Sequence, residues 1–312
     1  MRLSQVNPEL RPAYRFVRTT PVGHPGLVKL ARVVFPLIPH AKAPAGVRLE
    51  TVAQGGAGDL RVYTPDSGGS GAAVLWIHGG GLVIGAASQD DGRCFTIARD
   101  LDVVVVSVDY RLAPEYPFPT PLEDCRQAWQ WLQQHSAERG IDPARVAVGG
   151  QSAGGGLAAG LVQRLHDDGG VQPAAQWLFC PMLDDRTAGD RALDRIGHLL
   201  WDNRANRVGW QAYLGAAPGS PEVPVAAVPA RRTDFSGLPP AWIGTGDIEL
   251  FHAENLAYAA SLRAAGVACV LDVVPGAPHA FETVAPHTAV ARAYWQRSLD
   301  WLTGQLADGN QG

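Results

Sequence analysis

Short apolar segments alternate with longer helical patterns along most of the chain, from about residue 47 onward. Two of these segments, AVLWI at 73–77 and VVVVSV at 103–108, are nearly continuous and do not alternate with polar residues. Such runs are typical of parallel strands whose two faces are both covered by helices. The alternation therefore predicts an α/β fold with a doubly wound, mostly parallel sheet.

Eight segments have the apolar character and the flanking turn residues of strands. They are Val47–Val52, Leu60–Thr64, Ala73–His78, Val103–Asp109, Val146–Gly150, Trp177–Leu183, Ala241–Gly246 and Val267–Val274. Helical patterns occur at Asp91–Asp100, Pro121–His135, Ala153–His166, Ile248–Ala265 and Ala289–Gln305. Too few residues separate the first two strands for a crossover helix, so we expect an antiparallel pair at that edge of the sheet.

Two segments do not follow the alternation. Residues 1–45 are rich in proline and aromatic residues, and residues 184–240 separate two predicted strands by far more than one crossover helix requires. The second segment contains a helical pattern at Trp201–Leu214 and a proline-rich stretch from Pro218 to Pro229. Because long insertions in compact domains are usually lids or binding loops, we expect this one to contribute to a binding site.

The composition argues against several classes of protein. Hydrophobic residues make up 46% of the 312 residues and charged residues 18%, which is typical of a globular protein. Basic and acidic residues number 26 and 30, and no basic run occurs, so a nucleic-acid partner is not expected. The sequence has no apolar run of about 18 residues, the length that could span a membrane. No apolar segment follows the first charges, so no signal peptide is expected.

The four cysteines, Cys94, Cys125, Cys180 and Cys269, are far apart in the sequence and form no CxxC pair. Cys180 and Cys269 fall within apolar, strand-like runs, which favours buried free thiols. We therefore expect a protein of the reducing cytoplasm.

The sequence Gly150-Gln151-Ser152-Ala153-Gly154 directly follows a predicted strand and precedes a helical pattern. A nucleophile elbow needs this context, because small residues on both sides of the serine allow a sharp strand-to-helix turn. The turn also places Ser152 at a helix N-terminus, where backbone N–H groups favour developing negative charge. A G-x-S-x-G motif occurs by chance in roughly one in seven such chains, so the context carries this prediction against a plain glycine-rich turn.

Another predicted strand ends in His78-Gly79-Gly80-Gly81, upstream of the elbow. Consecutive glycines leave backbone N–H groups accessible, as an oxyanion hole requires. We expect Gly80, Gly81 and the N–H of Ala153 to be the donors. The alternative is a phosphate-binding loop, but neither a G-x-G-x-x-G pattern nor a P-loop Lys-Ser/Thr follows.

His279 is the predicted general base among the nine histidines. It lies in the turn-like segment Gly276–Phe281, just after the last predicted strand, which agrees with the chain order Ser…acid…His. The other histidines lie in helical patterns or lack a catalytic context, and a packing role for His279 is the alternative.

The acid that orients His279 has two candidates in the sequence, Asp247 and Glu249, which both follow the strand Ala241–Gly246. Local chemistry does not choose between them. One of the two could instead cap the next helix, a role that suits Asp247.

Several motifs in this order resemble those of the bacterial hormone-sensitive-lipase-like esterases of the α/β-hydrolase fold. They are His78–Gly81, the segment Tyr110-Arg111-Leu112-Ala113-Pro114-Glu115, the elbow and Pro278-His279-Ala280-Phe281. The resemblance covers about residues 45–305. It implies a carboxylesterase with a Ser–acid–His triad and neither a cofactor nor a metal. It also implies a helical cap formed by residues 1–45 and 184–240, over a catalytic core of residues 46–183 and 241–312.

The chain departs from the family pattern at three places. Gln151 stands where Asp is common, and Leu82 follows the glycines where an aromatic residue is frequent. The family's acid is usually an Asp followed by Pro-Leu or Leu-Phe and later by Tyr-Ala. Leu250-Phe251 and Tyr258-Ala259 place Glu249 at the position of that acid. The resemblance therefore favours Glu249 over Asp247.

We expect Ser152 to attack short-to-medium acyl esters, with His279 as base and Glu249 as acid. The aromatic residues of the insertion could line the pocket or form only the core of a small cap. An amidase, a formamidase or an acyltransferase could use the same triad. A small-molecule binding protein of this fold is a further alternative, although the presence of His279 argues against it. An aromatic, proline-rich surface could also support a homodimer.

Overall fold

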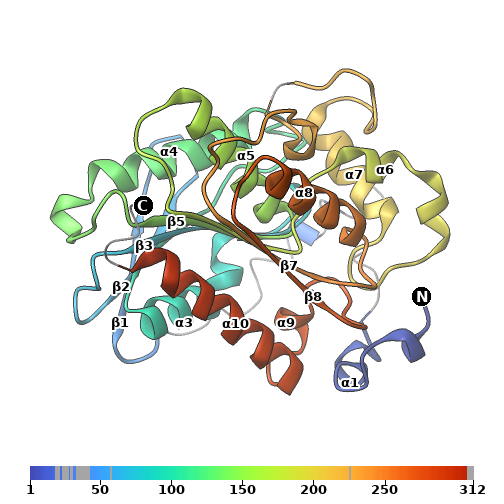
Figure 1. Cartoon of the computed structure of the whole chain (residues 1–312), viewed down its shortest axis with the longest axis horizontal. Coiled ribbons are helices and arrows are strands. Elements are labelled where there is room, and N and C mark those ends of the chain that lie inside the picture. The colour runs from blue at the N-terminus through green and yellow to red at the C-terminus, as the bar shows by residue number, and fades with distance from the viewer. Residues whose placement is uncertain are drawn as a thin grey trace.

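A central sheet of buried apolar strands organises the computed structural model, which describes residues 1–17, 22, 28, 31–32, 43–56, 58–224 and 226–307 (Figure 1). Within these residues, eight strands follow the order β1-β2-β4-β3-β5-β6-β7-β8. The pairs β1·β2 and β2·β4 are antiparallel and all others are parallel, which confirms the expected antiparallel edge. The strands are β1 (Val47–Val52), β2 (Leu60–Pro65), β3 (Ala73–Ile77), β4 (Val104–Val108), β5 (Val146–Gln151), β6 (Ala175–Phe179), β7 (Ala241–Gly246) and β8 (Cys269–Val274).

Helices cover both faces of this sheet, as Figure 1 shows. One face is covered by α3 (Asp91–Leu101) and α10 (Ala289–Leu306), and the other by α4 (Thr120–Gln134), α5 (Ala153–Asp168) and α8 (His252–Ala264). Alternate residues of β3 belong to different apolar clusters: Val74 and Trp76 face one layer, and Leu75 and Ile77 face the other. The continuous apolar runs of the sequence are therefore explained by burial on both faces.

Three of the predicted boundaries that were wrong, by two to four residues, have a clear local cause. Strand β6 ends at Phe179 rather than at Leu183, because Cys180 has a φ of 37° and Pro181 has no N–H for the ladder. Strand β8 begins two residues later than predicted, because the Val267 N–H still bonds to Leu262 of the preceding helix. Helix α8 begins only at His252, because the residues after β7 form turns.

The cysteine expectation was correct only in part. All four cysteines are free, and Cys180 is buried. Cys180, however, lies beyond the end of β6 rather than inside a strand, and Cys269 at the start of β8 is only partly buried.

The described residues of the insertion at 184–240 form two helices and two short 3₁₀ turns. These are α6 (Asp185–Gly189), η5 (Arg191–Arg195), α7 (Asn203–Leu214) and η6 (Pro229–Arg231). Helix α7 begins two residues later than predicted, because the Asp202 side chain caps it by accepting from the N–H groups of Arg204 and Ala205. The insertion packs on the loop after β3: a Cβ added to Gly81 would lie 2.1 Å from Trp201.

The N-terminal segment forms a short 3₁₀ turn, η1 (Leu3–Gln5), and a short helix, α1 (Arg11–Tyr14). Most of residues 18–42, which belong to the predicted N-terminal cap segment, lie outside the described residues, as do residues 57, 225 and 308–312. The Asn7 N–H donates to the Gly276 carbonyl at 2.7 Å, so the beginning of the chain contacts the loop that follows β8.

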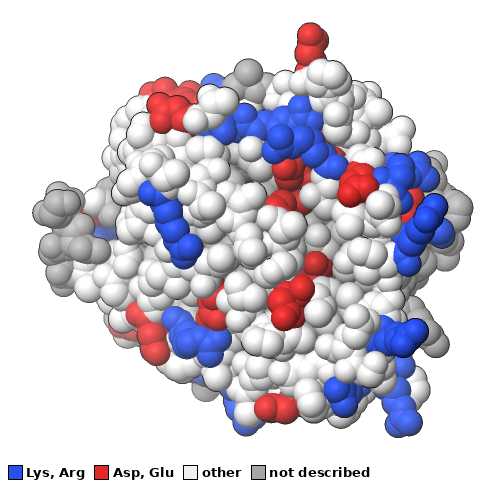
Figure 2. Space-filling model, turned by 45° about the vertical axis from the view of Figure 1, so that its right-hand side comes forward, with Lys and Arg blue, Asp and Glu red and all other residues white. Residues whose placement is uncertain are grey.

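Charged side chains are interspersed over a largely uncharged surface on the face seen in Figure 2, and neither sign forms a continuous stripe across it. Ion pairs join the insertion to itself and to the core: Arg231 binds Asp185, and Arg232 binds Asp167 of α5. No helix in the described part of the chain is long and apolar enough to cross a bilayer.

Candidate active site

Ser152 lies at a sharp turn between β5 and α5. Its backbone has a φ of 56° and a ψ of −121°, a strained conformation for a residue with a side chain. The flanking positions have no room for a side chain. A Cβ at Gly150 would lie 2.5 Å from the Gly154 carbonyl oxygen, and a Cβ at Gly154 would lie 2.1 Å from the Ile77 carbonyl oxygen. The G-x-S-x-G pattern thus has a direct steric cause in this turn.

Ser152, His279 and Glu249 form one hydrogen-bonded chain. His279 Nε2 lies 2.9 Å from Ser152 Oγ, and His279 Nδ1 lies 2.9 Å from Glu249 Oε2. All three residues are buried. A carboxylate on Nδ1 fixes the proton on that nitrogen and leaves Nε2 free to accept the proton of the serine.

Asp247 is not part of this chain of contacts. Its Oδ1 accepts a hydrogen bond from the Gly276 N–H at 2.6 Å, which fastens the turn after β7 to the loop after β8. The expectation that Asp247 caps the next helix was wrong, because α8 begins five residues later and the N-cap residue Phe251 has no side-chain cap.

Glu249 is held by two further donors besides His279. Thr245 Oγ1 donates to Oε1 at 2.8 Å, and the Phe251 N–H donates to Oε2 at 3.0 Å. These bonds fix the orientation of a side chain that is one methylene longer than aspartate. The loop after β7 therefore accommodates a glutamate and still fixes the orientation of its carboxylate.

The environment of His279 favours its charged form. Burial lowers the pKa of His279, but Cys180 and Glu249 raise it by more, and the net pKa lies well above the usual value of 6.5. Burial also raises the pKa of the Cys180 thiol, which is therefore neutral at pH 7. We accordingly assign the raised pKa of His279 to the Glu249 carboxylate.

The glycine loop after β3 lies next to this chain of contacts. Gly80 and Gly81 have φ values of 130° and 59°, which favour glycine. A Cβ at the preceding Gly79 would lie 3.4 Å from Ser152 Cβ, so the loop lies close to Ser152. None of the N–H groups of Gly80, Gly81 and Ala153 donates a hydrogen bond to another described residue. These three donors are therefore available to an oxyanion.

His78 supports the loop and does not contact Ser152. Its Nδ1 lies 2.7 Å from the Gly79 carbonyl, and its ring stacks on Tyr110 with centroids 4.2 Å apart. Burial lowers the pKa of His78, so the imidazole is neutral and Nδ1 carries the proton that bonds to the carbonyl.

A small cavity extends from Ala153 along α5 towards the insertion. Its volume is about 10 Å³, which is room for about one water molecule. Gly156 and Gly160 form its α5 side, and Trp210 and Tyr213 of α7 enclose it. Both aromatic residues are buried. Of the aromatic residues of the insertion, Trp210 and Tyr213 thus line a cavity, whereas Trp201 covers Gly81.

Sequence reasoning did not identify three residues near the site. Tyr14 donates its hydroxyl proton to the His279 carbonyl oxygen at 2.8 Å, and Thr245 holds Glu249 as described above. His198 of the insertion lies near enough to interact electrostatically with Glu249 and His279, and burial lowers its pKa. No local motif marks these residues, because their partners are distant in the sequence or provided by the turn geometry.

No group of three or more His, Cys, Asp or Glu side chains with a metal-binding arrangement occurs among the residues that were described. The groups that lie together at Ser152 are a hydroxyl, an imidazole and a carboxylate, with backbone N–H groups close by. Such a set can activate a serine for attack on an acyl carbon and stabilise the resulting oxyanion.

Comparison with known proteins gives three concordant similarities. Residues 74–283 match a family model described as alpha/beta hydrolase fold. The carboxylesterase NlhH of Mycobacterium tuberculosis is 32% identical over 301 residues, which cover 93% of this chain and 84% of NlhH. The carboxylic ester hydrolase LipN of the same species is 36% identical over 236 residues, 73% of this chain. The matched region is only 62% of LipN, less than two thirds of its length.

The structure named bacterial heroin esterase superposes with a TM-score of 0.89 at 35% sequence identity. The match covers 98% of this chain and 99% of that one. The similarity therefore includes the sheet, the helices on both faces and the insertion.

Proposed function

Because this chain belongs to the hormone-sensitive-lipase-like family of the α/β-hydrolase fold, we propose that it is a serine carboxylesterase acting on esters of short acyl chains. The observation that carries the proposal is the buried chain of hydrogen bonds from Ser152 through His279 to Glu249. Its relatives NlhH and LipN are named as a carboxylesterase and a carboxylic ester hydrolase, which supports the same reaction.

The reaction proceeds in two steps. Ser152 attacks the acyl carbonyl while His279 Nε2 takes the hydroxyl proton, and the N–H groups of Gly80, Gly81 and Ala153 bind the oxyanion. His279 then donates this proton to the leaving alkoxide. In the second step it activates a water molecule that hydrolyses the acyl-enzyme, and Glu249 stabilises the imidazolium in both steps.

The small cavity beside Ala153 supports a short acyl chain. At about 10 Å³ it has room for about one group of the size of water, such as a methyl, without movement of its walls. Trp210 and Tyr213 are buried, so a longer chain would have to displace large side chains that pack in the insertion. We propose that this cavity receives the acyl chain and that residues 184–240 act as the cap over it.

The free cysteines support a reducing compartment, in agreement with the cytoplasmic location expected from sequence. The substrate is a small molecule under this proposal, and dimer formation stays a prediction from the sequence.

Hydrolysis of p-nitrophenyl esters with acyl chains from C2 to C16 tests the function. We expect kcat/KM to be highest at C2–C4 and to fall by about tenfold or more by C8, because each added methylene must displace packed side chains. Folded protein that turns over none of these esters would contradict the proposal, and an amide substrate or a binding role would then be tested.

A matched variant tests the assignment of the cavity. A Cβ at Gly160 would lie 3.5 Å from its nearest neighbour, the Ala226 carbonyl oxygen, so Gly160→Ala fits without a clash. The methyl group should lower kcat/KM for C4 and longer chains while leaving C2 turnover close to that of the wild type. Alanine should also stabilise α5 by about 0.5–1 kcal/mol. An unchanged chain-length profile would place the acyl chain elsewhere.

The pH dependence of kcat/KM follows from the raised pKa of His279. Because the base must be neutral, kcat/KM should rise with pH through a midpoint above 6.5, the usual pKa of histidine. Removing the negative charge with Glu249→Gln should shift this midpoint to lower pH. A midpoint at or below 6.5 in the wild type, measured with p-nitrophenyl acetate, would contradict the assigned electrostatics.

A further inference from the structure

Gln151, the residue before the nucleophile, joins the two segments that carry Ser152 and His279. It ends β5 and is buried, and its side-chain Nε2 donates to Glu282 Oε1 and, at 2.8 Å, to Thr283 Oγ1. Glu282 and Thr283 belong to the short helix α9 (Phe281–Val284), which begins two residues after His279. One side-chain amide therefore bridges the elbow and the histidine loop.

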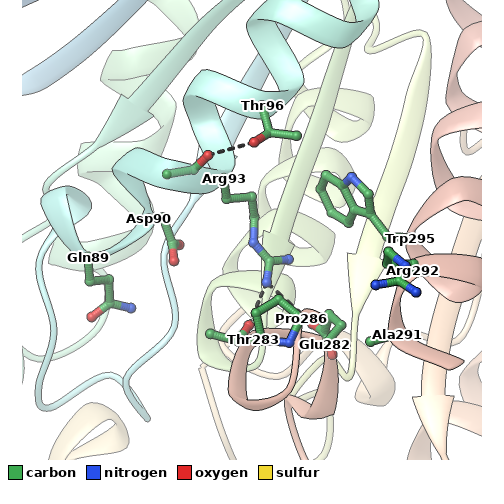
Figure 3. Close-up of a pocket in the computed structure, with 11 residues that line it drawn as sticks. Gln89, Asp90, Arg93, Thr96, Glu282, Thr283, Pro286, Ala291, Arg292 and Trp295 are labelled. Atoms are coloured by element: carbon green, nitrogen blue, oxygen red, sulfur yellow. Dashed lines mark hydrogen bonds and ion pairs between the residues drawn. The ribbon is translucent and has the colours of Figure 1, made fainter. Parts of the chain in front are cut away.

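Arg93 of α3 provides the positive charge for this bridge. Its Nη2 lies 2.5 Å from Thr283 Oγ1 and 3.5 Å from Glu282 Oε1. Figure 3 shows the side chain extending from α3 to these two residues, at the wall of a cavity of about 400 Å³ that Trp295 also lines. The guanidinium lies 5.2–5.3 Å from the ring centroids of Trp76, Phe179 and Trp295, which hold it in place.

Glu282 has few other means of compensation for its charge. Its side chain is 4% exposed, and a buried carboxylate needs both a counter-charge and hydrogen-bond donors. Arg93 provides the first, and the amide of Gln151 provides a donor. Gln151, which stands where the family commonly has Asp, therefore suits its neighbour Glu282. An acid at position 151 would place two carboxylates next to each other.

Three titratable groups interact electrostatically with Glu282: Tyr14 of the N-terminal segment, Tyr294 of α10 and Cys180 beyond β6. Burial raises the pKa of all three, so they are neutral at pH 7. Asp90 and Arg292 line the same cavity as Glu282. Arg93 is the cation that forms an ion pair with Glu282 in the structure.

We propose that Gln151, Glu282 and Arg93 are positioning residues that keep Ser152 and His279 at the distance needed for proton transfer. The proposal rests on the esterase function proposed above. None of the three residues touches Ser152 Oγ or the His279 ring through a recorded hydrogen bond; they act through the backbone segments that carry these groups. Gln151 is the member that couples the two segments.

The decisive variant is Gln151→Glu, which keeps the shape of the side chain and replaces its donor by a carboxylate. With p-nitrophenyl acetate at pH 8, we expect kcat to fall by about 10- to 100-fold, with little change in KM, because the two segments are pushed apart. The ratio of variant to wild-type kcat should recover towards pH 6, since two facing carboxyl groups then share a proton.

Exchanging the two groups tests the coupling. Glu282→Gln alone should lower kcat, because Arg93 loses its counter-ion. The double variant Gln151→Glu/Glu282→Gln restores one amide facing one carboxylate, so kcat should return to within about threefold of the wild type. A double variant no better than the product of the single effects would overturn the proposal.

Gln176→Glu is the matched control for the cost of burying a carboxylate. Gln176 is also a fully buried glutamine of the sheet, and its Nε2 donates to the Pro239 carbonyl at 3.0 Å, away from Ser152. This variant should lower Tm but keep wild-type kcat. If Gln151→Glu behaves in the same way, with a lower Tm and an unchanged kcat, its role is only structural and the proposal fails.

A second readout separates this proposal from the esterase function. The rate at which Ser152 is phosphorylated by a p-nitrophenyl dialkyl phosphate needs the serine and its base, but no particular carboxylic ester. Wild-type protein that is phosphorylated yet hydrolyses no ester would contradict the proposed function alone. Gln151→Glu that is phosphorylated at the wild-type rate would overturn the positioning network, whatever the ester results.

Discussion

Ser152→Ala should lower kcat for p-nitrophenyl acetate by about 10⁶-fold, because the acyl-enzyme can no longer form. The fold should be retained, since the substitution removes one oxygen from a turn that is fixed by the glycines at 150 and 154. The kcat of variant protein that is free of wild-type enzyme measures the loss of activity. Its Tm shows whether the fold is retained.

Ser107→Ala is the matched control for this experiment. Ser107 is a buried serine of β4 whose Oγ has no hydrogen-bond partner among the described residues. Its replacement should leave kcat unchanged and should not destabilise the protein, because no bond is lost. Retention of a tenth or more of the activity in Ser152→Ala would show that another group is the nucleophile.

Glu249→Gln should have the second largest effect, a decrease in kcat of about 10⁴-fold, as expected when the orienting carboxylate of such a triad becomes an amide. The amide can donate to Nδ1, which stabilises the tautomer whose Nε2 carries a proton and cannot act as base. The packing should survive, because Thr245 and the Phe251 N–H can still donate to the remaining side-chain oxygen. Steady-state kinetics at several pH values measures the decrease.

Asp247→Asn distinguishes the two acids that the sequence offered. Asparagine can still accept the hydrogen bond from the Gly276 N–H, so we expect less than about a tenfold decrease in kcat. The opposite result, near wild-type kcat for Glu249→Gln and a collapse for Asp247→Asn, would move the acid to position 247.

The fold could be predicted largely from the sequence, because burial on both faces gives the strands an unmistakable apolar signal. The predicted ends of strands were wrong where a local feature other than apolar character determines where the strand begins or ends. The prediction extends β6 past Cys180 because the run stays apolar to Leu183, although Pro181 within it cannot donate to the ladder. Its start was placed too late because Gln176 is polar, yet it lies fully buried with its amide bonded to Pro239.

The proximity of Ser152, His279 and Glu249 could be predicted because each follows a strand at the same edge of the sheet. The residues that hold them could not. Tyr14 donates a hydrogen bond to a residue 265 positions away in the sequence. Arg93 of α3 contacts Thr283 of α9, which is 190 positions away. Gln151 alone had a signal in the sequence, because it departs from the family pattern. The sequence did not indicate its partner, Glu282, which the structure places beside it.

The sheet separates the buried apolar side chains into two clusters that meet different helix layers. The cavity beside Ala153 lies on the α5 side, and most of the aromatic stacking, including Trp76, Trp177 and Tyr294, lies on the α3–α10 side. Substitutions on opposite sides share no contacts, so their free energies should add. In directed evolution, a library that reshapes substrate preference on one side can therefore be crossed with a stabilising library on the other, apart from the positions that touch Glu282.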